Sequence, residues 1–423
     1  MSRLKRDIPL LHVFGHSALS MSSHTIKGCL AILDIPLIIF MLLGGRCTIP
    51  PPTYPDQALA AARQPLTMNN YAIHEQLANS DTELSAQNLQ MRAGPERVSW
   101  LNINLTNPHI HLGVVLANNH LSSSGEVLSS MANRTHALAG INGDFFDGMV
   151  NPIGLVDING QIVQSPGYYT VLGVTASKHI TMGEEKLSGC VTNGRASHVL
   201  NSINHHGDTH NGQLTLFTPD LGAALSGLKD TIVTLQPITA STNSYIVQAI
   251  QPNATTLPRL SNLDALVGSG EAGTWLVHNL HPGNRITIIE RIVPDSNLVQ
   301  AIGGGPVLIK NGALYKDPNP PAPAEGNMRD PLTAIGVSKD GTHAFLVVFD
   351  GRLSGPSRSR GLTQAQMASY LLAHGAYQAM LFDGGGSSEM VARLRGQQRV
   401  SVINHPSDRH ERRIANGLFV YEC

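Results

Sequence analysis

The segment from Ala344 to Met390 constrains the fold of this chain more than any other stretch. Two short apolar runs within it, Ala344 to Phe349 and Ala379 to Phe382, each end in Asp-Gly, and a helical pattern lies between them. Short apolar runs bounded by turn residues are typical of buried strands. Because an intervening helix allows two strands to run parallel, we expect Asp350 and Asp383 to lie at the same end of one sheet.

Capping signals indicate helices at two places. Between the two runs, Thr363 and Gln366 form a capping box, apolar residues follow at helical spacing, and Gly375 is a typical helix end. Earlier in the chain, Ser123 and Glu126 form a capping box before a short amphipathic pattern. We therefore expect two short helices at these positions.

The composition favours strands over a helical bundle. The 423-residue chain is 42% hydrophobic and 14% charged, with 41 glycines and 25 prolines. Residues 168–300 hold short apolar runs without helix-length periodicity, and we expect only sheet there. The predicted fold class is α+β, with mixed, strand-rich sheets and a few short helices packed against them in a single large domain. A formal net charge of −1 gives no global field for binding nucleic acid, so we expect none as a partner.

The N-terminal segment has the features of an export signal. Basic residues precede the apolar stretch 29–45, whose uninterrupted part has the length of a signal-peptide core and is short for a membrane span. Residues 1–47 are interpreted as a signal peptide or an N-terminal membrane anchor, with any membrane attachment through residues 29–45. We interpret 48–95 as linker and lead-in and 96–423 as the folded domain, exported to the periplasm, the cell envelope or the medium.

Neither cysteine nor histidine predicts a metal site. Cys29, Cys47, Cys190 and Cys423 are too far apart for a zinc motif. Cys190 and Cys423 can pair in an exported protein, although we expect two reduced, buried thiols. The histidine-rich stretch 205–210 is more typical of a surface loop than of a zinc site. We predict no metal and no cofactor.

Polar clusters follow the predicted strands. In the hexapeptide from Asp383 to Ser388, the glycines Gly384, Gly385 and Gly386 allow backbone N–H groups to face one concavity beside the hydroxyls of Ser387 and Ser388. Such a concavity can hold phosphate oxygens, and a tight glycine turn leaving the strand is the alternative.

Two further clusters add charge. Arg352 and the arginines of residues 354–361 present guanidinium groups suited to phosphate, or form a solvated basic loop. Asn142, Asp144 and Asp147 follow a third predicted strand, residues 136–141. Together these clusters predict a site for an anionic substrate.

Several segments, in order along the chain, resemble the phosphodiester glycosidase family. They are SSMANRTHALAGINGDFFD (129–147), INHHGDTHNGQLTLFTPDLG (203–222), AIGGGPVLIKNG (301–312), DPLTAIGVSKDG (330–341), the segment 344–390 and ERRIANGLFVY (411–421). The resemblance covers about residues 95–423. It implies hydrolysis of a sugar-1-phosphodiester at the anomeric C–O bond, which releases free sugar and a phosphomonoester.

The resemblance also assigns candidate residues. The catalytic carboxylates it implies are Asp350, Asp383 and Asp144, and the substrate-binding groups are Asn142, Arg352, Arg329, Gly384, Gly385, Gly386, Ser387 and Ser388. The family commonly has arginine directly before its T-A-I-G strand, where this chain has Leu332, and Arg329 is the candidate to supply that charge.

The implied partner is a glycan or sugar-phosphodiester substrate. The alternative is an exported carbohydrate- or envelope-polymer-binding protein that keeps the scaffold without catalysis, and an ordinary glycosidase acting on a glycan without phosphate is a third reading.

Overall fold

The computed structural model describes residues 72–77, 82–91, 94–167, 170–205, 212–238, 243–318, 328–355 and 358–422. Strands grouped in several sheets account for most of its regular structure, with short helices against them, so the α+β prediction is confirmed. The first eight-stranded sheet contains, in spatial order, β1 (Ala72–Gln76), β2 (Thr82–Met91), β3 (Gly94–Asn104), β22 (His343–Phe349), β21 (Leu332–Ser338), β23 (Ala376–Leu381), β19 (Val307–Lys310) and β20 (Ala313–Leu314).

Two five-stranded sheets complete the main body. One contains β7 (Gln161–Gln164), β6 (Val156–Ile158), β18 (Leu298–Gly304), β8 (Thr170–Thr175) and β9 (Ile180–Glu184). The other contains β25 (Ser401–Val402), β24 (Met390–Ala392), β5 (Ala139–Asn142), β26 (Asn416–Glu422) and β4 (Ile110–Leu116). One buried apolar cluster joins these sheets to the first, with Leu346 of β22, Leu172 of β8 and Leu418 of β26 among its members. The main core therefore lies between the sheets.

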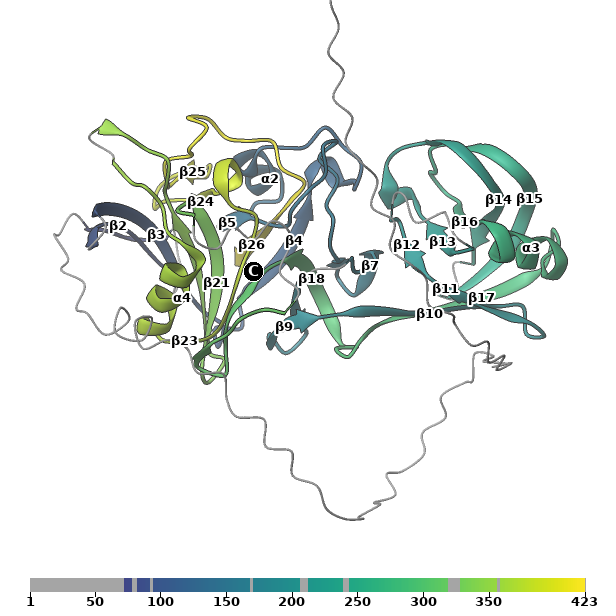
Figure 1. The fold of residues 1–423 in the computed structure, drawn as a ribbon, viewed down its shortest axis with the longest axis horizontal. Helices are drawn as coiled ribbons and strands as arrows, with labels where there is room; N and C mark the ends of the chain where they lie inside the picture. Colours follow the sequence, from purple (N-terminus) through teal and green to yellow (C-terminus); the bar gives the residue numbers. More distant parts are fainter. Residues whose placement is uncertain are drawn as a thin grey trace, which may run out of the picture.

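An inserted lobe lies between β9 and β18 along the chain, seen at the right of Figure 1. Its eight-stranded sheet contains β11 (Ser197–Leu200), β10 (Lys186–Thr192), β17 (Arg285–Val293), β15 (Ser244–Leu257), β14 (Leu225–Pro237), β16 (Asp264–Gly268), β13 (Leu214–Phe217) and β12 (Ser202–Ile203). Two separate apolar clusters stabilise this lobe.

Helix α4 (Gln364–Ala373) confirms the local prediction between the two Asp-Gly strands. Thr363 accepts from the Gln366 N–H, and both halves of the capping box are present. The buried face of the helix, which includes Met367 and Leu371, packs against the outer face of the first sheet. Gly375 follows with a φ of 91°, a left-handed conformation that glycine adopts without strain.

Strand β2 lies within residues 48–95, which were interpreted as linker and lead-in. Thr82–Met91 pairs with β3 along its whole length. Leu84 and Ala86 are buried on one face of the strand, and Leu89 is buried on the other, in a separate apolar cluster. Each face therefore carries few apolar residues, and the interleaved polar residues hid the pattern. The other domain boundaries remain predictions.

Helix α3 (Gly270–Asn279) lies where only sheet was expected. Its buried face consists largely of small residues, including Ala272 and Gly273. A Cβ atom added at Gly273 would lie 2.7 Å from the carbonyl oxygen of Gly268, so the helix packs very closely on the end of β16. Leu276 is the one large residue among the three buried positions of this helix, so the apolar pattern is short and the sequence did not predict the helix.

Helix α2 (Leu128–Arg134) forms near the predicted position, but the predicted capping box does not. Glu126 instead pairs with Arg134 at 2.9 Å. The N-terminal turn is capped from far along the chain, because the Glu411 carboxylate accepts from the Ser129 N–H at 3.0 Å and from its hydroxyl at 2.7 Å.

Cys190, on β10, is disulfide-bonded, which corrects the expectation of a reduced thiol. The chain's other cysteines and the expected signal or anchor segment lie outside the described residues. Within the described ranges, no helix is long and apolar enough to cross a membrane.

Candidate active site

The two Asp-Gly strands end at the same edge of one sheet, as predicted. Strands β22 and β23 are both antiparallel to β21, which lies between them, so they are parallel to each other. Asp350 and Asp383 therefore follow these strands at the same edge of the sheet. Since neighbouring strands lie about 4.8 Å apart, the two strand ends are about 10 Å apart.

Arginine side chains pack directly on the glycine turn that follows Asp383. A Cβ atom added at Gly386 would lie 1.9 Å from Nη2 of Arg412, and one at Gly385 would lie 3.3 Å from Nη2 of Arg352. Gly385 also has a φ of 61°. The backbone conformation of Gly385 favours glycine, and a side chain at Gly386 would displace the Arg412 guanidinium group.

Most N–H groups of this turn are used within the protein, which fits the alternative of a tight glycine turn. Gly384 donates to Oδ1 of Asp383 at 2.9 Å, and Gly385 donates to the carbonyl oxygen of Pro331 at 2.9 Å. Ser387 and Ser388 close the 3-10 turn η4 (Gly385–Ser387) by donating to Gly384 and Gly385 at 3.2 Å each. A tight turn returns its N–H groups to its own carbonyls, so positive charge here comes mainly from the arginines.

Asp383 is partly buried and is the most accessible of the candidate carboxylates. Burial raises its pKa to about 6, and the Asp330 charge acts in the same direction. Hydrogen bonds from Ser387 and Gly384 and the Arg412 charge oppose the rise. Its environment thus tunes Asp383 toward the range in which a carboxylate can exchange protons near neutral pH.

Asp144 lies fully buried close to Asp383. Burial raises its pKa to about 7, hydrogen bonds such as that from the Gly154 N–H at 2.6 Å oppose the rise, and the Asp383 charge adds to it. A Cβ atom at Gly303 would lie 2.7 Å from the Asp144 carboxyl group, so the backbone of β18 covers it closely. Its Oδ1 atom is buried with no hydrogen-bond partner among the described residues. The Asp383 N–H donates to the carbonyl oxygen of Gly143 at 3.0 Å, so Asp144 follows directly after a residue that contacts Asp383.

Asn142 holds this region together. Its Nδ2 donates to the carbonyl oxygen of Asp383 at 2.7 Å, and its Oδ1 accepts from the Thr333 hydroxyl at 2.7 Å and the Glu389 N–H at 3.1 Å. The amide is buried and satisfied by protein groups. These contacts fit a positioning role for Asn142 better than the expected substrate contact.

Asp350 is buried, and its carboxylate faces His405 and Arg97. Its Oδ1 accepts from the His405 N–H at 3.0 Å, and its Oδ2 lies 3.2 Å from Nδ1 of His405 and 3.6 Å from Nε of Arg97. Burial raises the pKa of Asp350, while the His405 and Arg97 groups oppose the rise. Asp350 and Asp383 thus have separate sets of partners.

The two candidate arginines differ in what they bind. Arg352 forms a two-pronged pair with Asp330, at 2.5 and 2.7 Å, and its side chain remains about half exposed. Arg329 pairs with the buried Glu96 and donates to the carbonyl oxygen of Gly361 at 2.8 Å. Both arginines are paired with a carboxylate, and the more exposed Arg352 is the better placed of the two for a ligand.

A family comparison covers this region. The model of the phosphodiester glycosidase family matches residues 238–421. The resemblance to the phosphodiester glycosidase family is confirmed there. The matched part contains Asp350, Asp383 and the glycine turn, whereas Asn142 and Asp144 lie before it.

Similar proteins extend the comparison. The SPbeta prophage-derived uncharacterized protein YomE of Bacillus subtilis strain 168 is 38% identical over 97 residues, which are 23% of this chain and 14% of that protein. A hypothetical protein from Synechocystis has a similar structure, with a TM-score of 0.66, 20% identity, and 85% of this chain and 64% of that chain covered. A predicted exported protein of Burkholderia pseudomallei K96243 has a TM-score of 0.60 and 23% identity, with 78% and 74% covered. The chain thus spans less than two thirds of the first two, and the structural likeness shows the fold alone.

Arg412 is a site residue that the sequence did not single out. It lies over Gly386, pairs with Asp408 at 2.7 Å and reaches the Ser387 hydroxyl at 3.5 Å. The quoted segment 411–421 contains it, but no local pattern distinguishes it from Arg413. Its role depends on how this segment is anchored.

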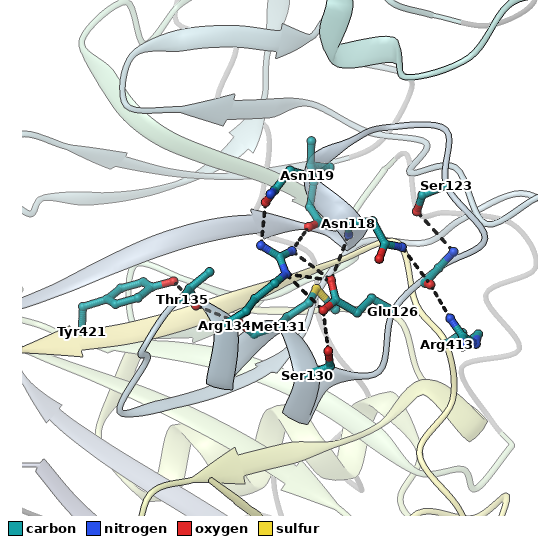
Figure 2. A network of polar contacts seen from close by, with 12 residues as sticks. Asn118, Asn119, Ser123, Glu126, Ser130, Met131, Arg134, Thr135, Arg413 and Tyr421 are labelled. Carbon is teal, nitrogen blue, oxygen red and sulfur yellow. Dashed lines mark hydrogen bonds and ion pairs between the residues drawn. The ribbon is translucent and has the colours of Figure 1, made fainter. Parts of the chain in front are cut away.

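The anchoring network is drawn in Figure 2. Arg413 donates to the carbonyl oxygen of Gly125 at 2.9 Å, beside the Glu126–Arg134 ion pair. Ile414 exchanges backbone hydrogen bonds with Glu126. The two neighbouring arginines therefore have different contacts. Arg413 binds the scaffold at Gly125, and Arg412 lies over the glycine turn.

The described residues contain no cluster of three or more potential metal-binding side chains, and His206 to His210 lie outside them. A cavity of about 410 Å³ lies beside the site and is lined by Leu353, Val402, Asn404, His405, Pro406, Arg409, His410 and Glu411. A larger cavity of about 500 Å³, between β4, β26 and β6, contains none of the candidate residues in its lining.

Proposed function

We propose that this protein hydrolyses a sugar-1-phosphodiester at the anomeric C–O bond and releases free sugar and a phosphomonoester. The observation that carries the proposal is the Asp383–Asp144 carboxyl pair beside a glycine turn on which Arg352 and Arg412 pack. The family match over residues 238–421 supports a hydrolase of the glycosidase type.

The arrangement suits this chemistry. A phosphate ester leaves readily, so the main requirements are cations near the developing negative charge and a carboxylate that acts as base or nucleophile at the anomeric carbon. Asp383 is the carboxylate that we assign to that role, because it is less buried than Asp144 or Asp350. The Asp383 charge helps to keep Asp144 protonated, and we assign the binding of the phosphate to the two guanidinium groups.

The direct test uses a panel of sugar-1-phosphodiesters, with both products followed by NMR. We expect Asp383→Asn to reduce kcat by at least about a hundredfold, because the amide cannot serve as base or nucleophile. Asp264→Asn is a matched control, since burial also raises the pKa of Asp264 to about 6, but on β16 of the inserted lobe. Turnover that survives in a folded Asp383→Asn variant would contradict the assignment.

The same panel separates the alternatives. Binding of a sugar phosphodiester without turnover would favour the carbohydrate-binding protein on the same scaffold. Turnover of phosphate-free glycosides that is insensitive to inorganic phosphate would favour an ordinary glycosidase.

We also propose that the protein is exported. The basic and apolar N-terminal segment supports this, and so does the disulfide at Cys190, because disulfides persist mainly in oxidising compartments. The similar Burkholderia protein is a predicted exported protein. Cell fractionation with N-terminal sequencing of the mature chain tests the proposal, and a cytoplasmic protein with an intact N-terminus would refute it.

A further inference from the structure

The pair formed by Asp350 and His405 has the geometry of an oriented imidazole. Both groups of His405 that face Asp350, the backbone N–H and Nδ1, lie within 3.2 Å of the carboxylate oxygens. An ionised carboxylate only accepts hydrogen bonds, so it favours the proton on Nδ1 and fixes the ring. The other ring nitrogen, Nε2, is then directed away from Asp350.

The His405 side chain is 45% exposed, whereas Asp350 is 1% exposed. His405 lines the cavity of about 410 Å³, together with Arg409 and His410. The carboxylate is therefore screened from the solvent, and the imidazole is the group that a ligand can reach. Glu411 also lines the cavity, but its oxygens are bound to Ser129.

The cavity is connected to the proposed site through a shared chain segment. His405 and Arg412 belong to the same segment between β25 and β26, which contacts Asp350 at one end and the glycine turn at the other. The ends of β22 and β23 are about 10 Å apart, a span that a histidine side chain and a phosphodiester group together can bridge. Leu353, one residue after Arg352, lines the same cavity.

We propose that His405, with both ring nitrogens protonated, is a catalytic residue whose Nε2–H hydrogen-bonds the leaving phosphate, and that Asp350 is a positioning residue acting through His405. This inference rests on the proposed function. As the anomeric C–O bond breaks, its electron pair passes to the phosphate oxygen, and the cationic imidazole stabilises that charge without transferring its proton. The oxygen of the attacking water forms the new bond to the anomeric carbon, and its proton passes to Asp383, which acts as the base in this step.

Two substitutions of His405 separate this role from a merely structural one. Asparagine places its amide nitrogen near the position of Nδ1 and keeps the contact with Asp350, whereas glutamine places a donor near the position of Nε2. We expect His405→Asn to lose about a hundredfold or more in kcat and His405→Gln to retain much more. If His405 served only to hold the chain against Asp350, His405→Gln would lose more kcat than His405→Asn. That result would overturn the proposal.

A double-mutant cycle tests the role of Asp350. If Asp350 acts only through His405, Asp350→Asn lowers kcat in the wild type and changes nothing further in the His405→Asn background. If the two losses in kcat multiply in the double variant, Asp350 has a direct role, and the claim that it acts only through His405 is refuted. His343→Gln, at the opposite end of β22, is the control, and thermal unfolding verifies that each variant is folded.

Phosphate binding gives a readout that does not depend on turnover. In a protein with ¹⁵N-labelled histidine, we expect inorganic phosphate to shift the His405 Nε2 resonance, and Asp350→Asn to reduce that shift. If the wild type turns over no phosphodiester but this shift occurs, the proposed function fails while the phosphate contact stands. The absence of any shift, with turnover intact, refutes the contact at His405.

Discussion

Glu389 offers a sharp test of the electrostatics beneath the glycine turn. It is 3% exposed and lies beside Glu411, and burial followed by the contact with Glu411 raises its pKa to about 9 from the usual value of 4.5. The folded protein therefore keeps the proton over a pH range in which the unfolded chain loses it. The stability associated with this group is complete below about pH 4.5 and is lost as the pH rises toward 9.

The size of the effect follows from the pKa difference. Each pH unit between the two values costs about 1.4 kcal/mol of unfolding free energy, so the loss at pH 7 is on the order of 3 kcal/mol. In Glu389→Gln the amide N–H replaces the acid O–H as donor to Glu411 and does not titrate. We expect this variant to gain on the order of 3 kcal/mol over the wild type between pH 5.5 and 7.5.

Chemical denaturation at these two pH values measures the difference. Glu422→Gln, at an exposed position on β26, is the matched control and should show no such pH dependence. A difference between Glu389→Gln and the wild type that stays constant from pH 5.5 to 7.5 would refute the shared-proton interpretation of this carboxyl pair.

Two further predictions concern the turn and its anchor. Gly386→Ala should destabilise the fold by about 1–3 kcal/mol and abolish phosphate binding. The reason is that the new methyl group would overlap the Arg412 guanidinium, which lies 1.9 Å from its position. The control is Gly183→Ala, which has no atom within 4 Å of the new methyl group and should unfold at the wild-type temperature. The Glu126–Arg134 pair predicts an acid-sensitive anchor: its hydrogen bonds lower the pKa of Glu126 despite burial, so its stabilisation is present above about pH 4.5 and is lost as the pH falls through the lowered value. Thermal unfolding of Glu126→Gln should therefore show a deficit at pH 7 that shrinks toward pH 3, and a deficit independent of pH would contradict this reading.

Local sequence patterns predicted the elements that depend on their own residues. The Thr363–Gln366 capping box and helical spacing specify α4, and the two apolar runs specify parallel strands with Asp350 and Asp383 at one edge. The same patterns failed for α3, whose packing face is too small to show periodicity.

The site itself depended on tertiary structure. Glu126 has the spacing of a capping residue, yet it pairs with Arg134, while Glu411 caps α2 from 282 residues away. His405 meets Asp350 across 55 residues.

The sequence by itself determined the strand-rich fold, the glycine turn and the aspartates that precede it, because periodicity and turn chemistry act over a few neighbouring residues. Only the tertiary structure decided that Arg412 faces the turn while Arg413 faces the scaffold, and that His405 stands in front of Asp350. Pairing between charged groups depends on distance in space, and the spacing of residues along the chain does not encode it.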